Sequence, residues 1–478
     1  MSEDWATKEM KGAQLGDQRQ VKSVIRICAA VAAQPALSFS AACGPAVRQA
    51  AHRIFAHADT TVEGLLAGHF TATAARAATL PLVLIAQDTT AFVYGQAQIV
   101  GLAPVSQSTK KHALFGHSAL ALTPDGTPLG LWHLSLWGAP EVAPSRAAGR
   151  QRAREEKASW KWFAGLEAIA ARLPTGCEGV LIQDREGDIF DFLAHERPPR
   201  LHLLLRAAQD RRVEYEAAAT TATAATPGVS AAETRTERGL LFAVAAGAPV
   251  LGTCRVAVAG KPAAGGKPAQ PAREAELALR VTEVRVQRPH KHTEATPAEV
   301  AVWLLDATEV HPPEGVEPLH WVLLTTLPLP DLEAACRVLG YYARRWLIER
   351  LHYTLKSGLG AEKLQIDDAT SLAHALAVYY VAAWRLLHLT HTAREHPDTP
   401  ATTVLAADEL EVLAAFVGQP VRTVGDAVLA VARLGGYEYY QNAPPPGVKT
   451  LWQGQIRLDG LRIGWQLAKA SSNQRHDL

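Results

Sequence analysis

Residues 341–358 read YYARRWLIERLHYTLKSG, and this stretch combines helical spacing with an unusual set of functional groups. Four of its side chains fall within about 60° of one another on an α-helix, which turns by about 100° per residue. They are those of Tyr342, Arg345, Glu349 and Lys356. A carboxylate can bind a hard cation, while arginine, lysine and a phenol can bind phosphate oxygens. The spacing therefore favours phosphate chemistry, although Arg345 and Glu349 also fit an ordinary i, i+4 ion pair on a solvated helix face.

The opposite side of the same predicted helix is apolar. Ile348, Leu351 and Leu355 fall there, so the spacing predicts one amphipathic helix that buries this stripe and presents the four functional side chains. Six cations and two acids lie between Arg337 and Lys363, although the formal net charge of the 478-residue chain is only +1. A local basic stripe on a nearly neutral protein suits a nucleic acid that is bound along a path.

The pattern Tyr-x2-Arg-x3-Glu-x6-Lys resembles the signature of DDE transposases of the insertion-sequence-four family, and the resemblance extends along nearly the whole chain. It implies an α/β fold with a ribonuclease-H-like catalytic core and an inserted β domain, flanked by helical N- and C-terminal domains. The N-terminal domain, residues 1–75, would bind the transposon ends. Residues 76–375 would form the catalytic domain, with a β-rich insertion at about 206–320, and residues 376–478 would form a dimerisation domain.

The composition of the sequence and the spacing of its apolar residues change along the chain. Residues 1–75 are rich in alanine and helical in period, whereas apolar runs punctuated by Gly, Pro and Asp follow from residue 80. Four of these runs, LPLVLIAQDTT, HALFGHSALAL, TPLGLWHLSLW and GVLIQDREGD, are typical of buried strands. A predicted helix, EEKASWKWFAGLEAIAARL, separates the third run from the fourth. VRVQ, AVWLLDATEV and HWVLLTT are further strand candidates, and the chain after residue 376 is helical in pattern.

Three other segments are irregular. AAATTATAATPG and GKPAAGGKPAQPA are low-complexity segments that we expect to be mobile loops. A basic cluster, Arg146, Arg150, Arg152 and Arg154, lies in SRAAGRQRAREEK. This cluster either binds nucleic acid or belongs to an exposed loop.

Two of the apolar runs end in an aspartate, Asp88 after LIAQ and Asp184 after LIQ. The carboxyl ends of sheet strands are where open α/β folds place their sites, although a single aspartate there is more often a turn former or a helix N-cap. Asp184 follows Asp88 by 96 residues, and Glu349 follows 165 residues later. Three converging carboxylates can hold two Mg²⁺ ions, with Mn²⁺ as the expected substitute, and such ions can support an in-line displacement at phosphorus. We therefore expect Asp88, Asp184 and Glu349 to be both the catalytic residues and the metal ligands.

The resemblance assigns further residues to DNA. Tyr342, Arg345 and Lys356 would contact phosphates near the transposon end. Trp321 matches a tryptophan that stacks on a base flipped from the duplex, whereas taken alone it would be a core aromatic at a strand start. Tyr353 stands where a DNA-contacting lysine is found in the family's best-known member, so one phosphate contact is lost or replaced by a hydroxyl. The other basic residues expected at DNA are Arg206 in the core and Arg19, Lys22, Arg26, Arg48 and Arg53 in the N-terminal domain.

The composition excludes several other classes of protein. The N-terminus MSEDWATKEMKGAQLGDQ lacks the apolar run of a secretory signal, and no uninterrupted apolar stretch reaches membrane-spanning length. Five cysteines without a Cys-x2-Cys pair and 18 histidines without ligand spacing indicate reduced thiols and no zinc site. We expect a cytoplasmic protein that associates with a bacterial nucleoid when it acts and has no membrane partner.

The resemblance implies a cut-and-paste DNA transposase that acts as a homodimer on paired ends. It would nick the DNA, form and open a hairpin, and transfer 3′-hydroxyl ends into target DNA. Trp452, Ile456, Leu458 and Leu461 are the apolar side chains expected to supply the dimer contact. Two alternatives stay open: a catalytically inactive DNA-binding inhibitor or domesticated relic would keep the fold and lose the metal site, and a structure-specific nuclease would cleave without transfer.

Overall fold

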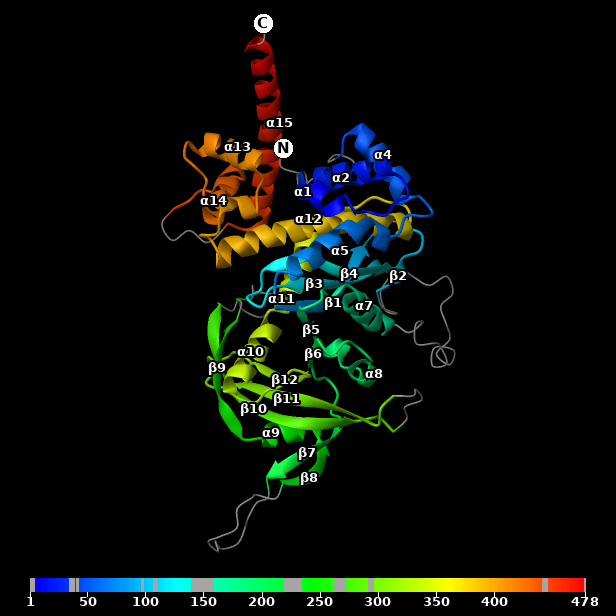
Figure 1. Ribbon diagram of the computed structural model, residues 1–478, viewed down its shortest axis with the longest axis vertical. Helices are drawn as coiled ribbons and strands as arrows, with labels where there is room; N and C mark the ends of the chain where they lie inside the picture. The colour runs from blue at the N-terminus through cyan, green and yellow to red at the C-terminus, as the bar shows by residue number, and fades with distance from the viewer. Residues whose placement is uncertain are drawn as a thin grey trace, which may run out of the picture.

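The chain is a mixed α/β protein built around one large mixed sheet, with helices at both ends of the sequence (Figure 1). The computed structural model describes residues 5–33, 39, 43–95, 99–105, 111–138, 159–218, 234–258, 260, 272–290, 296–440 and 446–476. The cluster of Arg146 to Arg154 and most of the two low-complexity segments lie outside these residues.

Five strands form the part of the sheet that carries the two expected aspartates. They are β1 (Leu82–Tyr94), β3 (His112–Leu122), β4 (Pro128–Trp137), β5 (Glu178–Gln183) and β6 (Leu201–Arg206). Strands β1, β5 and β6 run parallel, while β3 pairs antiparallel with β1 and β4 pairs antiparallel with β3. Helix α7 (Trp160–Arg172) connects β4 to β5. The four strands and the helix predicted here are confirmed, because the apolar runs of the sequence are buried on both faces of the sheet.

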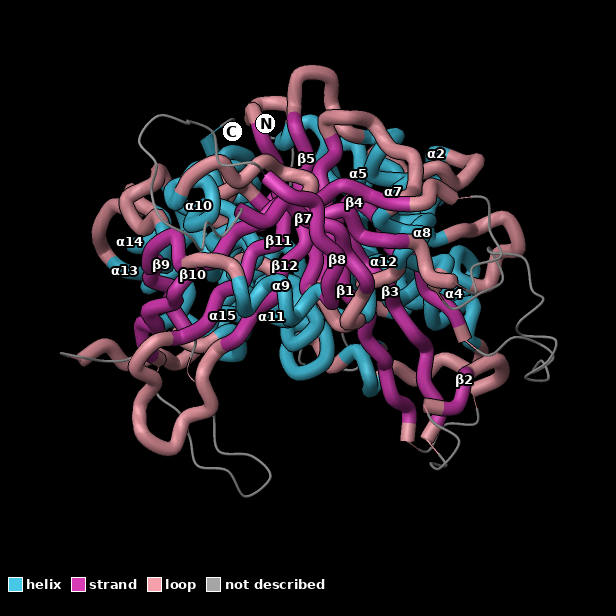
Figure 2. The backbone as a smooth tube through the Cα atoms, turned by 90° about the horizontal axis from the view of Figure 1, so that it is seen from below, coloured by secondary structure: helices cyan, strands magenta, loops and turns pink. Residues whose placement is uncertain are grey.

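The sheet continues without a break into the strands of the region that was expected to be a β-rich insertion. Beyond β6 the order is β12–β11–β10–β7–β8, and β9 pairs with β10. These strands are β7 (Arg212–Ala218), β8 (Thr234–Leu240), β9 (Val250–Val258), β10 (Arg273–Gln287), β11 (Glu299–Glu309) and β12 (His320–Thr325), with α9 (Leu241–Gly247) between β8 and β9 and β2 (Ala103–Pro104) at the opposite edge. Figure 2 shows the strands crossing the middle of the molecule with helices on either side.

Side-chain alternation along β1 gives the sheet two different faces. Val83 and Ile85 pack in one apolar cluster with α7, whereas Leu84 and Ala86 pack in the other with the terminal helices. The sheet therefore separates two hydrophobic cores, and successive residues of β1 face different cores.

The terminal helices gather around one long helix, α12 (Ala369–Glu395), which runs across the molecule beneath α1 and α2 in Figure 1. It contacts α2, α4 and α5 as well as α14 and α15. The helices before the sheet are α1 (Trp5–Met10), α2 (Gln18–Ala33), α4 (Pro45–Phe55) and α5 (Val62–Ala77), and those after α12 are α13 (Ala407–Val417), α14 (Val424–Leu434) and α15 (Val448–His476). The helical patterns predicted for both ends are confirmed. The expected domain boundaries at residues 75 and 375 fall inside α5 and α12.

Helix α12 is long and apolar enough to cross a membrane by length and composition alone. However, 89% of its most apolar window is buried inside the protein. Its apolarity is explained by packing, because both groups of terminal helices cover it.

Buried hydrogen bonds tie the N-terminal helices to β4. The carboxylate of Glu9 accepts from Nδ1 of His69 at 2.6 Å and from Nη1 of Arg76 at 2.7 Å. The backbone N–H of Leu131 donates to Nε2 of His69, and Nε of Arg76 donates to the carbonyl of Leu129. Since both nitrogens of His69 are used by the neutral ring, this network fixes the tautomer and holds α1 and α5 against the sheet.

The prediction of one continuous helix over the opening motif was wrong. The stretch is divided into α10 (Leu332–Ala343), α11 (Trp346–Tyr353) and a π-helical turn, η3 (Thr354–Gly358). The N–H of Ile348 bonds to the carbonyl of Arg345 three residues back, and that of Leu359 bonds to Thr354 five residues back. The hydrogen bonds are therefore of the i, i+3 type before α11 and of the i, i+5 type after it. Both departures from the α-helical i, i+4 pattern rotate the side chains away from an ideal stripe.

The expected dimer patch is only partly at the surface. Trp452 and Leu458 are 2% and 0% exposed and pack in the same core as α12. Farther along α15, Leu461 and Ile463 are 45% and 57% exposed. The first half of α15 thus belongs to the core of the protein. Farther along, Gln466 and Lys469 still contact Asp408 and Glu411 of α13, and the end of the helix projects away from the body in Figure 1.

Candidate functional site: an acidic cluster and a set of basic helical residues

Asp88 and Asp184 lie at the same level on neighbouring parallel strands. The last paired residues of β1 and β5 are Ala86 and Ile182, so the register continues two residues on to Asp88 opposite Asp184. Neighbouring strands lie about 4.8 Å apart, which brings the two aspartates to one place on one face of the sheet. Strand β1 continues to Tyr94, so Asp88 lies within its strand and not at its end as predicted. Asp184 does follow the end of β5 directly.

Asp88 is a partly buried carboxylate among charged groups. Its side chain is 18% exposed, and its Oδ2 lies 3.9 Å from Nη1 of Arg345. Burial raises the pKa of Asp88 to about 6, and the charges of Asp184 and Glu349 add to this, while Arg345 opposes it. A raised pKa of this kind is typical of carboxylates that share a site.

Glu349 approaches the same place from α11. Nη2 of Arg345 contacts Oε1 of Glu349, so one guanidinium lies against both Asp88 and Glu349. The side chain of Glu349 is 55% exposed, whereas that of Arg345 is only 16% exposed. The i, i+4 pair considered from the sequence therefore exists, and it lies at the acidic residues and not on a distant solvated face.

Among the residues that the structure describes, no three His, Cys, Asp or Glu side chains stand together as ready metal ligands. The donor set is nevertheless of the kind that Mg²⁺ binds, since three carboxylates offer hard oxygen ligands. Their mutual repulsion, which contributes to the raised pKa of Asp88, is the electrostatic condition that a divalent cation relieves.

Asp184 also has a local structural role. Its Oδ1 accepts a hydrogen bond from the N–H of Glu186 at 2.9 Å and so caps the short helix η2 (Arg185–Gly187). The N-cap considered from the sequence is thus real, and it uses one of the two carboxylate oxygens. The nearby Asp188 is purely structural, because its buried carboxylate accepts from Arg211 and from two backbone N–H groups.

Sequence reasoning missed His352. It is 6% exposed, with Nδ1 at 3.8 Å from Oδ2 of Asp88 and Nε2 at 3.0 Å from Oγ of Ser118. Ser118 lies directly opposite Asp88 in the β1–β3 register. Burial lowers the pKa of His352 to about 3, so the ring is neutral beside Asp88. A histidine three residues after Glu349 was the available signal, but its buried orientation depends on the packing of α11.

Tyr342, Trp321 and Arg206 form a second layer next to Arg345. The rings of Trp321 and Tyr342 meet edge to face with centroids 5.2 Å apart. Tyr342 is 5% exposed, which corrects the expectation of a fully presented phenol. Burial raises the pKa of Tyr342, and the guanidinium groups of Arg345 and Arg206 oppose that rise. Four predicted residues from β6, β12, α10 and the turn before α11 are therefore brought together.

Lys356 reaches the acidic residues from the π-helical turn. Its ammonium lies 5.7 Å from the centroid of Phe92 in β1. Burial lowers the pKa of Lys356, while Glu362 and Asp88 oppose that shift. Glu362 also accepts from the backbone N–H of Val93, which anchors the segment after this turn to β1.

The basic residues of the N-terminal helices lie on a separate surface. Arg19, Lys22 and Arg26 are exposed at i, i+3 and i+7 of α2, opposite the buried Val24 and Ile27. On α4, Arg53 is exposed and Arg48 is half-buried. These five side chains lie on α2 and α4, whereas Asp88, Asp184 and Glu349 belong to β1, the end of β5 and α11.

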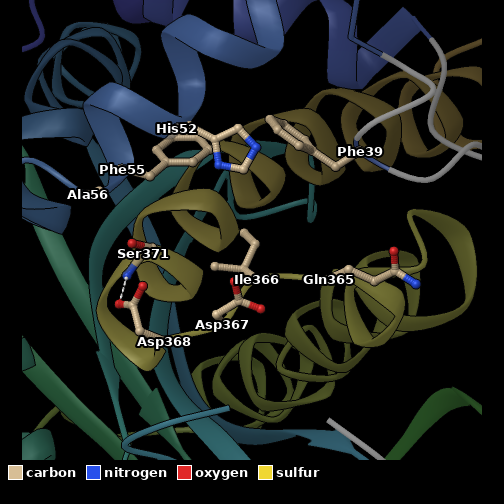
Figure 3. Close-up of a pocket in the computed structure, with 9 residues that line it drawn as sticks. All are labelled: Phe39, His52, Phe55, Ala56, Gln365, Ile366, Asp367, Asp368 and Ser371. Atoms are coloured by element: carbon tan, nitrogen blue, oxygen red, sulfur yellow. Dashed lines mark hydrogen bonds between the residues drawn. The ribbon is translucent and has the colours of Figure 1, made fainter. Parts of the chain in front are cut away.

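A cavity of about 190 Å³ lies between α4 and the segment before α12 (Figure 3). Its lining includes Phe55 and His52 from α4, with Asp367 and Asp368 from the facing segment. Asp368 caps α12 by accepting from the N–H of Ser371, as the dashed line shows. Asp88, Asp184 and Glu349 do not line this cavity, so it is distinct from the acidic cluster.

Residues 2–60 match the family model for transposase DNA-binding domains. The match covers α1, α2 and α4, and with them all five predicted basic residues of the N-terminal helices. It supports a transposase that binds DNA, with residues 2–60 as the matching DNA-binding part.

Proposed function

We propose that this protein is a cut-and-paste DNA transposase of the DDE type, similar to the insertion-sequence-four family and to the transposase of transposon five. The observation that carries the proposal is the register of β1 and β5, which brings Asp88 level with Asp184 while Arg345 joins Asp88 to Glu349. The transposase DNA-binding match at residues 2–60 lies on the same chain.

The strand order of the core supports a ribonuclease-H-like fold. Three antiparallel strands, β4, β3 and β1, are followed across the sheet by the parallel strands β5 and β6, with α7 in the connection from β4 to β5. In this proposal the strands from β7 to β11 are the inserted β domain.

In the proposed mechanism Asp88, Asp184 and Glu349 would hold two Mg²⁺ ions, and such ions would supply charge stabilisation for an in-line displacement at phosphorus. Burial of Asp88 keeps water away from its carboxylate and strengthens its interaction with any cation. Arg345 is poised to exchange its carboxylate partners for a DNA phosphate, since its planar fork matches both. Lys356, whose charged form is disfavoured by burial, supplies a second positive charge at the same phosphate path.

The roles of the remaining residues follow their positions. Trp321 would stack on a flipped base, and Tyr342 would hold Trp321 and Arg345 in place through its buried ring. The five basic residues of α2 and α4 would contact phosphates of the transposon end. Two copies of the chain would pair the ends, with contacts from the exposed second half of α15.

The test uses the purified full chain and a supercoiled plasmid that carries the gene with its own flanking DNA. The proposal predicts Mg²⁺-dependent breaks at the two element ends, hairpin-ended fragments and products joined to new target sites. Retarded DNA complexes without any break would favour the inactive DNA-binding alternative. Breaks without joined products would favour the structure-specific nuclease.

A further inference from the structure

A pair of buried carboxamides lies directly behind the two aspartates. Gln87 and Gln183 are 0% and 1% exposed, and Nε2 of Gln183 donates to Oε1 of Gln87 at 2.7 Å. Each glutamine immediately precedes one aspartate, Asp88 or Asp184. Because side chains alternate along a strand, the glutamines face the core on the α7 side and the aspartates face the other side.

The hydrogen bond between the glutamines lies where the backbone pairing of the two strands stops. The last paired residues of β1 and β5 are Ala86 and Ile182, and residue 184 already begins a turn. The side-chain hydrogen bond from Gln183 to Gln87 is therefore the next contact between the two strands after the last backbone pairing. It lies one residue before each of the two carboxylates.

Two glycines confine the pair from outside the sheet. A Cβ at Gly165 in α7 would lie 2.1 Å from Nε2 of Gln87, and a Cβ at Gly187 in η2 would lie 2.3 Å from Oε1 of Gln183. Both distances are shorter than any van der Waals contact, so a larger residue at either place would displace the carboxamide. Helix α7 and the turn after Asp184 therefore pack closely against the two carboxamides and restrict their positions.

Packing alone would favour apolar side chains over glutamines at positions 87 and 183. Nε2 of Gln87 and Oε1 of Gln183 have no hydrogen-bond partner among the described residues. Val83, Ile85 and Leu181 occupy the preceding positions on the same face, and all are apolar. Two apolar side chains would continue this pattern without leaving buried polar atoms unsatisfied.

We propose that Gln87 and Gln183 are positioning residues that fix the separation between the Asp88 and Asp184 carboxylates. This inference rests on the proposed function, in which those carboxylates bind the metal ions. Groups behind metal ligands orient them, and their loss weakens metal affinity by about 10- to 100-fold. The pair thus acts on metal affinity without touching the metal.

The test is a titration of the full chain with Mn²⁺, followed by electron paramagnetic resonance of the free ion. Wild type, Asp88→Asn, Gln87→Leu, Gln183→Leu and the double leucine variant are compared, each with its thermal unfolding midpoint. Single leucine variants should lose stability, because the remaining carboxamide is left unpaired, whereas the double variant should regain it. Mn²⁺ affinity should fall about 10- to 100-fold in all three leucine variants and should not recover in the double variant.

Matched controls separate positioning from general damage. Gln455→Leu removes another buried glutamine, which donates to Glu409 at 3.2 Å near the C-terminus, and should leave Mn²⁺ affinity unchanged. Gly165→Ala should weaken Mn²⁺ binding by displacing Gln87, whereas Gly247→Ala, which meets nothing within 4 Å, should not. Recovery of Mn²⁺ affinity together with stability in the double variant would overturn the positioning role and leave a packing role. Mn²⁺ binding that does not depend on Asp88 in the wild type would instead overturn the proposed function, and this inference with it.

Discussion

Trp321 combines a half-buried ring with a place beside the acidic cluster. It is the second residue of β12 and meets the buried ring of Tyr342, which fixes one edge of the indole. Packing of this kind suits a core aromatic, and it equally suits a ring held ready to stack on a base.

Trp321→Ala should slow hairpin formation more than the first nick, because only the hairpin requires a base to leave the duplex stack. Stacking on an aromatic ring contributes about 1–3 kcal/mol per base, so the hairpin step should fall by roughly 5- to 150-fold. Single-turnover cleavage resolved on denaturing gels would measure the two steps separately. Trp303→Ala, in the neighbouring strand β11, is the matched control for loss of a half-buried tryptophan. Equal loss of both steps in Trp321→Ala would return Trp321 to a packing role.

The residues that could be located from the sequence include the two aspartates that directly follow an apolar run, although only Asp184 stands at the end of its strand. LIAQD and LIQD each combine an apolar run with an aspartate, and the register of β1 and β5 brings these aspartates level. His352 and Ser118 could not be found in this way, because their contacts depend on how α11 packs against β1 and β3. The sharing of Arg345 between two acids depends on the same packing.

At the scale of elements, local patterns predicted the strands and helices but not the breaks within them. The four apolar runs from residue 80 became β1, β3, β4 and β5 because each is buried on both faces. The division between α10 and α11 left no signal in the sequence, since residues 343–345 lack glycine and proline and keep helical backbone angles. The π-helical turn at Thr354–Gly358 is likewise set by contacts, with Glu362 and Tyr94 holding the following segment against β1.

Helix α2 presents a basic face that is expected to bind DNA phosphates. Arg19→Ala, Lys22→Ala and Arg26→Ala should each weaken binding to an element end and reduce the salt dependence. Each lost phosphate contact lowers the slope of log affinity against log salt by about 0.9. Gel-shift titrations at several salt concentrations would measure both quantities.

Arg433→Ala supplies the control for this series, because Arg433 is an exposed arginine on α14 outside the DNA-binding match. An unchanged salt slope in all three α2 variants would mean that DNA lies on another face of the N-terminal helices.

Over the molecule as a whole, the N-terminal helices, the sheet and α12 meet around histidines that are buried or partly buried, such as His69 and His388. His388 of α12 donates from Nδ1 to the carbonyl of Pro128 at 2.9 Å, and its ring lies against Trp384. Burial lowers the pKa of His388 to about 4 from its usual 6.5. Between these two pKa values the unfolded chain binds a proton that the folded protein excludes, so folding stability is complete above pH 6.5 and falls as pH drops toward 4.

Acidification should therefore lower the free energy of unfolding, with His388 alone contributing a loss on the order of 3 kcal/mol between pH 6.5 and 4. Urea unfolding followed by tryptophan fluorescence at several pH values would measure the effect. His388→Gln, which cannot titrate, should show a shallower fall of stability over this range. A pH dependence identical to that of the wild type would show that His388 titrates alike in the folded and the unfolded protein.

The two halves of α15 differ in burial, because the first half packs in the core and the second half carries exposed apolar side chains. Removal of the whole helix would expose the core around Trp452 and Leu458, so point changes in the second half test pairing more cleanly. Leu461→Glu and Ile463→Glu should leave single-end binding intact and abolish paired-end complexes and two-ended excision. Native gels and an excision assay on a two-ended donor would measure these outcomes. Val250→Glu, at a 53% exposed position of β9, controls for a new surface charge. Efficient two-ended excision by both α15 variants would move the pairing surface to another part of the molecule.

The central claim is that Asp88, Asp184 and Glu349 form one metal-dependent DNA-cutting site on a DNA-binding protein. Its most direct test is the rate of Mg²⁺-dependent cleavage at an element end by Asp88→Asn, Asp184→Asn and Glu349→Gln, with end binding measured in parallel. Each isosteric change is expected to lower cleavage by at least about a thousandfold, the loss of roughly 4 kcal/mol of transition-state stabilisation, while end binding stays within a few-fold of wild type. Cleavage at the wild-type rate by any one of the three variants would contradict the claim and remove that residue from the site.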